Sequence, residues 1–240
     1  NTAQNHLRIF APAKINLFLH ITGKRSDGYH LLDSLVAFAD IGDTITITPS
    51  KTFSFEVTGT FANNFDTATS QPYINSDNLV VKAARALAQV SGKPLNVKIT
   101  LEKNLPLSSG IGGGSADAAA TLWGLQELWN LNRQEEYLLP LMTNLGADVP
   151  VCLYSRETMM RGIGDKLTPA PDLPEIPIIL VNPLLPCSTE NIFLRYQKDF
   201  KNPVPAPHAI ASPYDLINFL HHTENDLYPA ALTLIPQIEN

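Results

Sequence analysis

Four glycines gather in one short segment of the chain, 106–116, which reads PLSSGIGGGSA. An alanine-rich stretch with the pattern of a helix follows it directly and ends near Trp129. Glycines let the backbone approach an anion closely, and the start of a helix adds about half a positive charge at the same place. The segment therefore predicts an anion cradle, and phosphate is the ligand that suits such a cradle best.

Three other interpretations of the glycine segment can be compared with this one. A P-loop must close on Lys-Ser or Lys-Thr, whereas Gly114 is followed here by Ser115 and Ala116, which excludes it. A dinucleotide-binding turn lies tight against a strand, whereas the polar stretch 102–109 intervenes here, which weakens that interpretation. A flexible turn stays open, although ordering four glycines without a ligand costs much conformational entropy.

Lys14 and Asp148 are two charged residues whose local sequence leaves both a functional and a structural interpretation open. The stretch 15–21, INLFLHI, alternates as a strand does, and Lys14 shares the face of Asn16 opposite the aliphatic residues. We expect a polar cleft on that face; an exposed strand lysine is the alternative. Asp148 precedes Val149 and Pro150, where it could act in catalysis or simply cap the next segment.

Composition narrows the class of protein. The chain has 240 residues, of which 44% are hydrophobic, and a net charge of -6 with scattered lysines and arginines, so we expect a folded protein with no nucleic-acid partner. Cys152 and Cys187 lack the spacing of metal ligands, which predicts no metal site within the chain and a reducing, cytoplasmic setting. No apolar run is long enough to span a bilayer, so no membrane partner is expected.

Periodicity places the elements that must hold these residues. Alternating residues predict strands that start the fold in an antiparallel arrangement, at 15–21, 32–38, 45–48 and 53–57, followed by a strand at 95–101. A helix is predicted at 79–90, where Asp77 or Asn78 would cap it and Gly92 would end it. A second is predicted at 115–129 and a third at 134–145, which Pro140 would bend or break. Two more are predicted near the end of the chain, one from Ser212 onward and one at 225–238. Prolines cluster at 169–186 around one predicted strand, 178–181, so a domain boundary is expected near residue 160.

The glycine segment resembles the P-x-x-x-G-(L/I)-G-S/G-S motif of the GHMP kinases. Four further segments resemble one family within them, the 4-diphosphocytidyl-2-C-methyl-D-erythritol kinases: APAKINLFLHITGKRSDGYHLLDSL, LGADVPVCLY, RGIGDKLTP and VNPLLPCSTENIF. The likeness covers nearly the whole chain, and the DGYH and LGADVP motifs are specific within the superfamily.

The resemblance implies an α+β fold of two domains. Residues 1–160 would form the N-terminal GHMP kinase domain, a mixed sheet with helices like ribosomal S5 domain 2, and residues 161–240 a ferredoxin-like α/β domain. The family's third motif, a glycine-rich S/T-G-S/T-G-A loop, is absent from the sequence, so we expect the second domain to be incomplete at its C-terminus.

The resemblance also implies an activity and its residues. The chain would use ATP and Mg²⁺ to phosphorylate the 2-hydroxyl of 4-diphosphocytidyl-2-C-methyl-D-erythritol in non-mevalonate isoprenoid biosynthesis, as a monomer or weak homodimer. Lys14 and Asp148 would be the catalytic pair. The ATP site would comprise Pro106, Leu107, Ser108, Ser109, Gly110, Ile111, Gly112, Gly113, Gly114, Ser115 and Ala116 around the phosphates, with Asn78, Leu79 and Lys103 beside the adenine. The substrate site would comprise Asn16, Tyr29, His30, Thr189 and Phe193.

Two other functions stay open from the sequence. A homoserine- or mevalonate-type kinase would share the fold but would have no use for an aromatic pocket that binds a base. A nucleotide-binding protein without catalysis is the other alternative, supported by the missing third motif. Tyr29 and His30 could then be an ordinary turn tyrosine and a solvated histidine.

Overall fold

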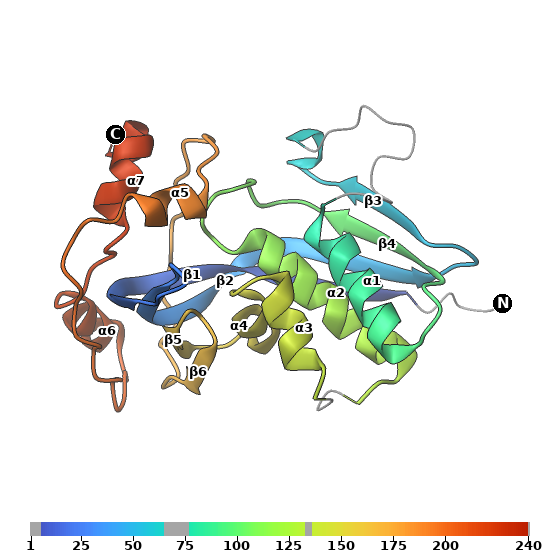
Figure 1. Ribbon diagram of the computed structural model, residues 1–240, viewed down its shortest axis with the longest axis horizontal. Coiled ribbons are helices and arrows are strands. Elements are labelled where there is room, and N and C mark those ends of the chain that lie inside the picture. Colours follow the sequence, from blue (N-terminus) through green and yellow to red (C-terminus); the bar gives the residue numbers. More distant parts are fainter. Residues whose placement is uncertain (1–5, 65–76, 133–135, 240) are drawn as a thin grey trace. The chain divides into compact units, whose positions relative to one another are not determined.

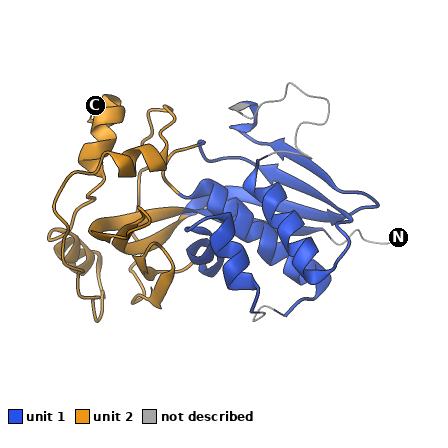
Figure 2. Cartoon of the chain, in the orientation of Figure 1, with its two compact units in different colours: residues 1–13, 40–107, 112–154 blue, residues 14–39, 108–111, 155–240 orange. Residues whose placement is uncertain are grey.

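The structure is a computed structural model that describes residues 6–64, 77–132 and 136–239 (Figure 1). The chain forms two compact units, each built from segments that are distant in sequence (Figure 2). Unit 1 comprises residues 1–13, 40–107 and 112–154, and unit 2 comprises residues 14–39, 108–111 and 155–240. A single boundary at residue 160 stays a prediction, since unit 2 also takes two earlier segments.

The first two strands are long and contribute residues to both units. Strand β1 (Leu7–Lys24) pairs with β2 (His30–Pro49), and the turn between them is closed by a 2.8 Å hydrogen bond from the backbone N–H of Arg25 to the carbonyl of Tyr29. Gly28 lies in this turn with φ of 95°, a conformation that favours glycine. The alternating pattern at 15–21 thus belongs to one continuous strand, β1.

Unit 1 contains a mixed sheet. The second half of β2 pairs antiparallel with β4 (Val97–Glu102), where Ile47 lies opposite Ile99, and β3 (Ser54–Thr58) pairs parallel with β4. The expected antiparallel arrangement is therefore wrong for β3. Its strand follows β2 in sequence, but β4 comes between them in the sheet. A short 3-10 helix, η1 (Ala62–Asn64), follows β3.

Unit 1 also contains four helices that contact one another (Figure 1). They are α1 (Leu79–Ser91), α2 (Gly113–Trp129), α3 (Leu138–Leu145) and α4 (Val149–Tyr154). Helix α2 approaches the strands closely, because a Cβ atom on Gly124 would lie 2.6 Å from Ile9 Cδ1 and 2.7 Å from Ile47 Cδ1. The glycine segment is thus followed by a helix that is firmly packed on the core.

The ends of these helices test the predictions made from local signals. Asn78 caps α1, since its side chain accepts a 2.9 Å hydrogen bond from the Val80 N–H, and Gly92 ends the helix with φ of 65°. The expected bend at Pro140 is wrong, because this proline is the third residue of α3, in the first turn, where a backbone N–H needs no helical partner. Residues 134 and 135 of the helix predicted there lie outside the described residues.

Unit 2 contains a second set of strands. The first half of β2 pairs antiparallel with β5 (Thr158–Gly162), which pairs antiparallel with β6 (Lys166–Pro169). Phe18, Leu35 and Met159 form the buried centre of this unit. The helices that follow are α5 (Thr189–Leu194), α6 (Pro213–Leu220) and α7 (Tyr228–Leu234), with the 3-10 helix η2 (Pro236–Glu239) after them.

Two predictions for the C-terminal part need correction. The strand predicted at 178–181 is wrong, because no strand is assigned within the described residues 170–239 and Ile179 and Val181 are 88% and 90% exposed. The last helix is shorter than predicted: α7 ends at Leu234, and Pro236 cannot continue it. Ser212 does cap α6 as predicted. In the part of the chain that the structure describes, no helix is both long and apolar enough to cross a membrane.

Candidate functional site

The start of α2 has the geometry that an anion cradle requires. Gly112 precedes the helix with φ of 67°, and the first bond of the helix runs from the Ala116 N–H to the Gly112 carbonyl at 2.8 Å. The N–H groups before Ala116 therefore have no partner within the helix, and 17 residues of aligned peptide dipoles lie behind them. Ser108 and Gly110, earlier in the segment, also have positive φ, at 52° and 76°.

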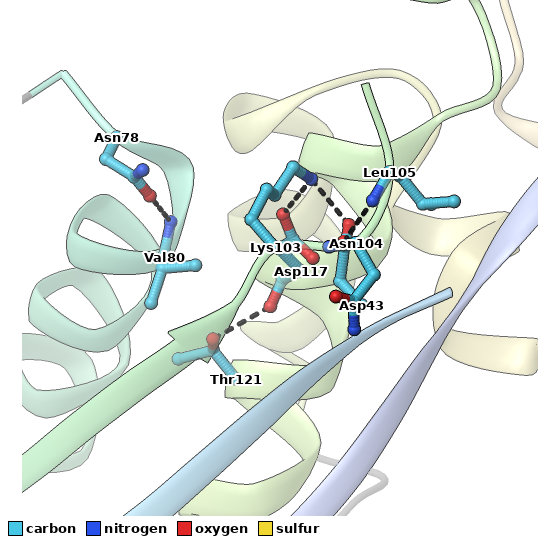
Figure 3. Close-up of polar contacts among 8 residues, drawn as sticks. All are labelled: Asp43, Asn78, Val80, Lys103, Asn104, Leu105, Asp117 and Thr121. Atoms are coloured by element: carbon cyan, nitrogen blue, oxygen red, sulfur yellow. Dashed lines mark hydrogen bonds and ion pairs between the residues drawn. The ribbon is translucent and has the colours of Figure 1, made fainter. Parts of the chain in front are cut away.

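A buried cluster of charges lies next to the start of α2 (Figure 3). The Lys103 ammonium donates hydrogen bonds to Asp43 Oδ2 at 2.5 Å and to Asp117 Oδ2 at 2.8 Å, and Lys103 itself is 1% exposed. Burial works to lower the pKa of Lys103, but the two carboxylates reverse this and raise it, so Lys103 stays a cation. Burial raises the pKa of the Asp117 carboxyl to about 7, although Lys103 works in the opposite direction. We call Asp43, Lys103 and Asp117 the Lys103 cluster.

The residues predicted to lie beside the adenine are all in unit 1. Asn78 and Leu79 lie at the start of α1, and Leu79 Cδ1 would be 3.6 Å from a Cβ atom on Gly114, so Leu79 is next to the start of α2. The ammonium of Lys103, in contrast, is held by two carboxylates rather than presented at a surface. An adenine contact of this side chain stays a prediction, and its burial does not favour one.

Lys14 is buried at the start of a chain of side-chain hydrogen bonds in unit 2. Its ammonium donates to Asn16 Oδ1 at 2.7 Å, so the prediction that Lys14 and Asn16 share a face is confirmed. Asn16 Nδ2 donates to the Ser34 hydroxyl at 2.8 Å, and this hydroxyl donates to the Phe18 carbonyl at 2.6 Å. Lys14 is 3% exposed, so the alternative of an exposed strand lysine is wrong.

The backbone of Lys14 is also joined to the glycine segment. Its N–H donates a 2.9 Å hydrogen bond to the carbonyl of Ile111, and both residues belong to unit 2. Strand β1, which carries Lys14, therefore holds Ile111 of the glycine segment in place.

Asp148 lies in unit 1, in the turn between α3 and α4, and is partly buried. Its carbonyl accepts a 3.1 Å hydrogen bond from the Cys152 N–H, which puts its backbone at the start of α4, where the capping alternative would have it. Lys14 and Asp148 belong to different units, so their action as a pair stays a prediction.

Three aromatic rings meet in unit 2 around His30. The rings of His30 and Phe193 stack with centroids 5.5 Å apart and an interplanar angle of 23°, and Tyr196 meets His30 edge-on at 5.8 Å. Burial, with a smaller contribution from Lys24, lowers the pKa of His30, so the imidazole is neutral at pH 7. Tyr29, next to His30, is 61% exposed. A neutral imidazole with an exposed phenol beside it can stack on a planar base and hydrogen-bond its edge.

The structure brings some of the predicted substrate residues together. His30 and Phe193 are in contact although 163 positions separate them, and Thr189 is exposed as the first residue of α5, the helix that carries Phe193. Inspection of the sequence missed Ser34, Asp43, Asp117 and Tyr196. A signal existed for one of them: an aspartate within the alanine-rich start of a helix, as at Asp117, needs a partner if it is buried.

No group of three or more histidine, cysteine, aspartate or glutamate side chains that could hold a metal ion is found among the described residues. Proteins usually bind Mg²⁺ together with a nucleotide through phosphate oxygens, waters and one or two carboxylates. The cradle at the start of α2 fits the phosphates of such a complex, since it offers N–H groups and the positive end of a helix dipole.

Comparison with known proteins gives consistent results. Residues 78–156 match the family model described as the GHMP kinases N terminal domain. The chain is 47% identical over 232 residues to the 4-diphosphocytidyl-2-C-methyl-D-erythritol kinase of Paramagnetospirillum magneticum, covering 96% of this chain and 78% of that relative. It is 46% identical over 233 residues to the protein of the same name from Agrobacterium fabrum, covering 95% and 76%.

Solved structures show the same likeness. A crystal structure of 4-(cytidine 5'-diphospho)-2C-methyl-D-erythritol kinase matches with a TM-score of 0.74 and 32% identity, covering 97% of this chain and 80% of that one. A homoserine kinase from Cytophaga hutchinsonii matches with a TM-score of 0.55 at 20% identity, which shows a shared fold alone.

Proposed function

Because the chain belongs to the 4-diphosphocytidyl-2-C-methyl-D-erythritol kinases, a family of GHMP kinases, we propose that it transfers the terminal phosphoryl group of ATP to the 2-hydroxyl of 4-diphosphocytidyl-2-C-methyl-D-erythritol. The observation that carries the choice of substrate is the stack of His30 on Phe193 with Tyr29 exposed beside it. A kinase for homoserine or mevalonate would have no base for these rings to bind.

Phosphoryl transfer asks a protein mainly to position its reactants and to offset charge. The backbone N–H groups at the start of α2 would bind phosphate oxygens, and the helix dipole would favour their negative charge. Mg²⁺ bound with ATP would neutralise further charge on the phosphates. These are the roles we propose for Gly112, Gly113, Gly114 and Ser115 in the loop.

We propose that Asp148 accepts the proton of the attacking hydroxyl and that Lys14 supplies a positive charge beside the phosphoryl group. Removing the proton of an alcohol with an aspartate before any bond forms would be strongly unfavourable, because a carboxylate is a far weaker base than an alkoxide. The proton therefore moves to Asp148 late, as the new oxygen–phosphorus bond forms. Lys14 would offset charge on the phosphoryl group during its transfer.

Asn16 and Ser34 hold the Lys14 ammonium in one orientation. Ser34→Ala removes the hydroxyl that accepts from Asn16, so the amide can turn and Lys14 loses its fixed acceptor. We expect kcat to fall about tenfold or more, because small misplacements of catalytic groups are costly, with little change in the KM for ATP. Steady-state kinetics with Ser34→Thr as the matched control checks this, since threonine keeps the hydroxyl; wild-type kcat in the alanine variant would exclude the orienting role.

Binding of cytidine 5'-diphosphate tests the proposed substrate class without turnover. Isothermal titration of the purified chain should give a binding isotherm for cytidine 5'-diphosphate and a weaker one for the uridine compound, because the unprotonated ring nitrogen of a neutral His30 would accept a hydrogen bond from the cytosine amino group, where uracil carries a carbonyl oxygen. Equal affinity for both nucleotides would contradict base recognition at His30.

A further inference from the structure

We call the glycine segment 106–116 the phosphate loop, and residues 108–111 its tip. The two segments of unit 1 on either side of this tip, 40–107 and 112–154, are joined by the Lys103 cluster (Figure 3). Asp43 comes from β2, Lys103 directly follows β4, and Asp117 lies near the start of α2. All three are almost fully buried, with 0%, 1% and 2% of their surface exposed. The cluster therefore connects the strand that leads into the loop with the helix that leads out of it.

Asp43 fixes the backbone that enters the loop. Its Oδ1 accepts hydrogen bonds from the backbone N–H groups of Asn104 at 2.6 Å and Leu105 at 2.8 Å, and Pro106 is the next residue. Its Oδ2 accepts from the Lys103 ammonium. One carboxylate thus holds three donors from three consecutive residues.

Lys103 extends this support to the helix after the loop. Its ammonium donates to Asp117 Oδ2, and a Cβ atom on Gly113 would lie only 3.1 Å from Nζ, so the ammonium lies against the first residue of α2. Thr121 donates to the backbone carbonyl of Asp117 at 2.8 Å within the same helix. The start of α2 therefore meets the Lys103 ammonium at two places, the Asp117 side chain and the backbone of Gly113.

Stability alone does not account for this cluster. Buried ion pairs are often no more stabilising than apolar residues of the same size, because desolvation offsets their attraction. Asp117 Oδ1 is buried and has no hydrogen-bond partner among the residues that the structure describes, which adds a further cost. What the cluster supplies is geometry: directional bonds that fix two backbone segments against each other.

We propose that Asp43, Lys103 and Asp117 are positioning residues that hold the backbone on both sides of the phosphate loop, and that they thereby set the affinity for the phosphates of ATP rather than for its adenosine part. This inference rests on the proposed function, which assigns ATP to the loop. Lys103 then acts through the backbone of Gly113 and through Asp117, not by contact with the base.

Asp43→Asn is the principal test. The amide cannot keep all three bonds of the carboxylate, since its NH₂ group faces an ammonium or a backbone N–H. We expect the affinity for ATP, measured by isothermal titration, to fall about tenfold or more with the affinity for adenosine unchanged. Asp226→Asn is the matched control: Asp226 is 1% exposed, pairs with Lys201 at 2.6 Å and accepts the Ile21 N–H at 2.8 Å, but belongs to unit 2. It should lower stability and leave the ratio of ATP to adenosine affinity unchanged.

Asp117→Asn is a milder variant that keeps the Lys103–Asp43 pair. In this variant, the backbone amides of Gly113 to Ser115 should exchange hydrogen with solvent faster than in the unchanged chain. The ratio of ATP affinity to adenosine affinity should also be lower. Folded Asp43→Asn and Asp117→Asn variants with the unchanged ratio would overturn the proposal. If the unchanged chain itself bound ATP no better than adenosine, the proposed function would fail instead.

A pair of glycine variants tests the cluster in the chain with all three charges intact. Gly114→Ala should raise the midpoint of thermal unfolding, because alanine favours helix and its Cβ would meet Leu79 at an ordinary 3.6 Å. Gly113→Ala should lower it, because the methyl group would press on an ammonium that two carboxylates hold. Equal stabilisation by both changes would contradict a rigid Lys103 cluster.

Discussion

Asp148→Asn is expected to lower kcat by about 10²- to 10⁴-fold, the usual contribution of a general acid or base, while the Kd for ATP stays near that of the unchanged chain. The amide keeps the shape of the side chain but cannot take up the proton of the attacking hydroxyl. Single-turnover measurements with saturating ATP, together with isothermal titration of ATP, separate the two effects. The result would assign chemistry to Asp148 rather than nucleotide binding.

Asp215→Asn serves as the control for this variant. Asp215 lies in the first turn of α6, is exposed, and accepts a 2.8 Å hydrogen bond from Ser212, so it also stands near a helix start without a proposed role in the reaction. Its kcat should stay within about twofold, as expected of a surface substitution. If Asp148→Asn retained near-normal turnover, Asp148 would act only at the start of α4, as the capping alternative holds.

Tyr29→Ala is expected to raise the KM for the cytidylylated substrate by about 5- to 150-fold, because stacking on an aromatic ring contributes about 1–3 kcal/mol per base. The side chain is 61% exposed, so its removal should leave the fold intact. Tyr29→Phe keeps the ring and should keep most of the affinity. Steady-state kinetics at fixed, saturating ATP measures both variants, and an unchanged KM in the alanine variant would remove Tyr29 from the base site.

Elements set by local signals could be predicted from the sequence. The signals for both ends of helix α1 are local: the sequence offers Asp77 or Asn78 as its cap and Gly92 as its end, and Asn78 and Gly92 act on the backbone of their own neighbours. Ser212 located the start of α6 for the same reason. Alternation likewise put Lys14 and Asn16 on one face of a strand, and their hydrogen bond confirms it.

Elements that depend on distant partners could not be predicted in this way. The apolar run 178–181 has the composition of a strand but stays exposed, and a strand needs a neighbour to pair with. The parallel pairing of β3 with β4 depends on the order of strands in the sheet, which alternation does not encode. Pro140 was expected to disrupt a helix whose true start, Leu138, makes it harmless.

The candidate site divides in the same manner. The glycine segment and its helix are indicated locally, whereas the bond between Lys103 and Asp43 joins residues 60 positions apart, one in β2 and the other directly after β4. The contact of His30 with Phe193 was implied only by the family resemblance, since nothing in either local segment indicates the other. The assignment of a substrate class therefore depended on the family and on the three-dimensional structure together.

Product identification by ³¹P NMR tests the central claim most directly. The purified chain, with ATP, Mg²⁺ and 4-diphosphocytidyl-2-C-methyl-D-erythritol, should produce ADP and an equal amount of a new phosphomonoester, with carbon coupling that places it on the 2-hydroxyl. Homoserine and mevalonate should give no comparable product. A chain that binds ATP but forms no phosphomonoester on this substrate, or that phosphorylates homoserine or mevalonate faster, would contradict the proposed function.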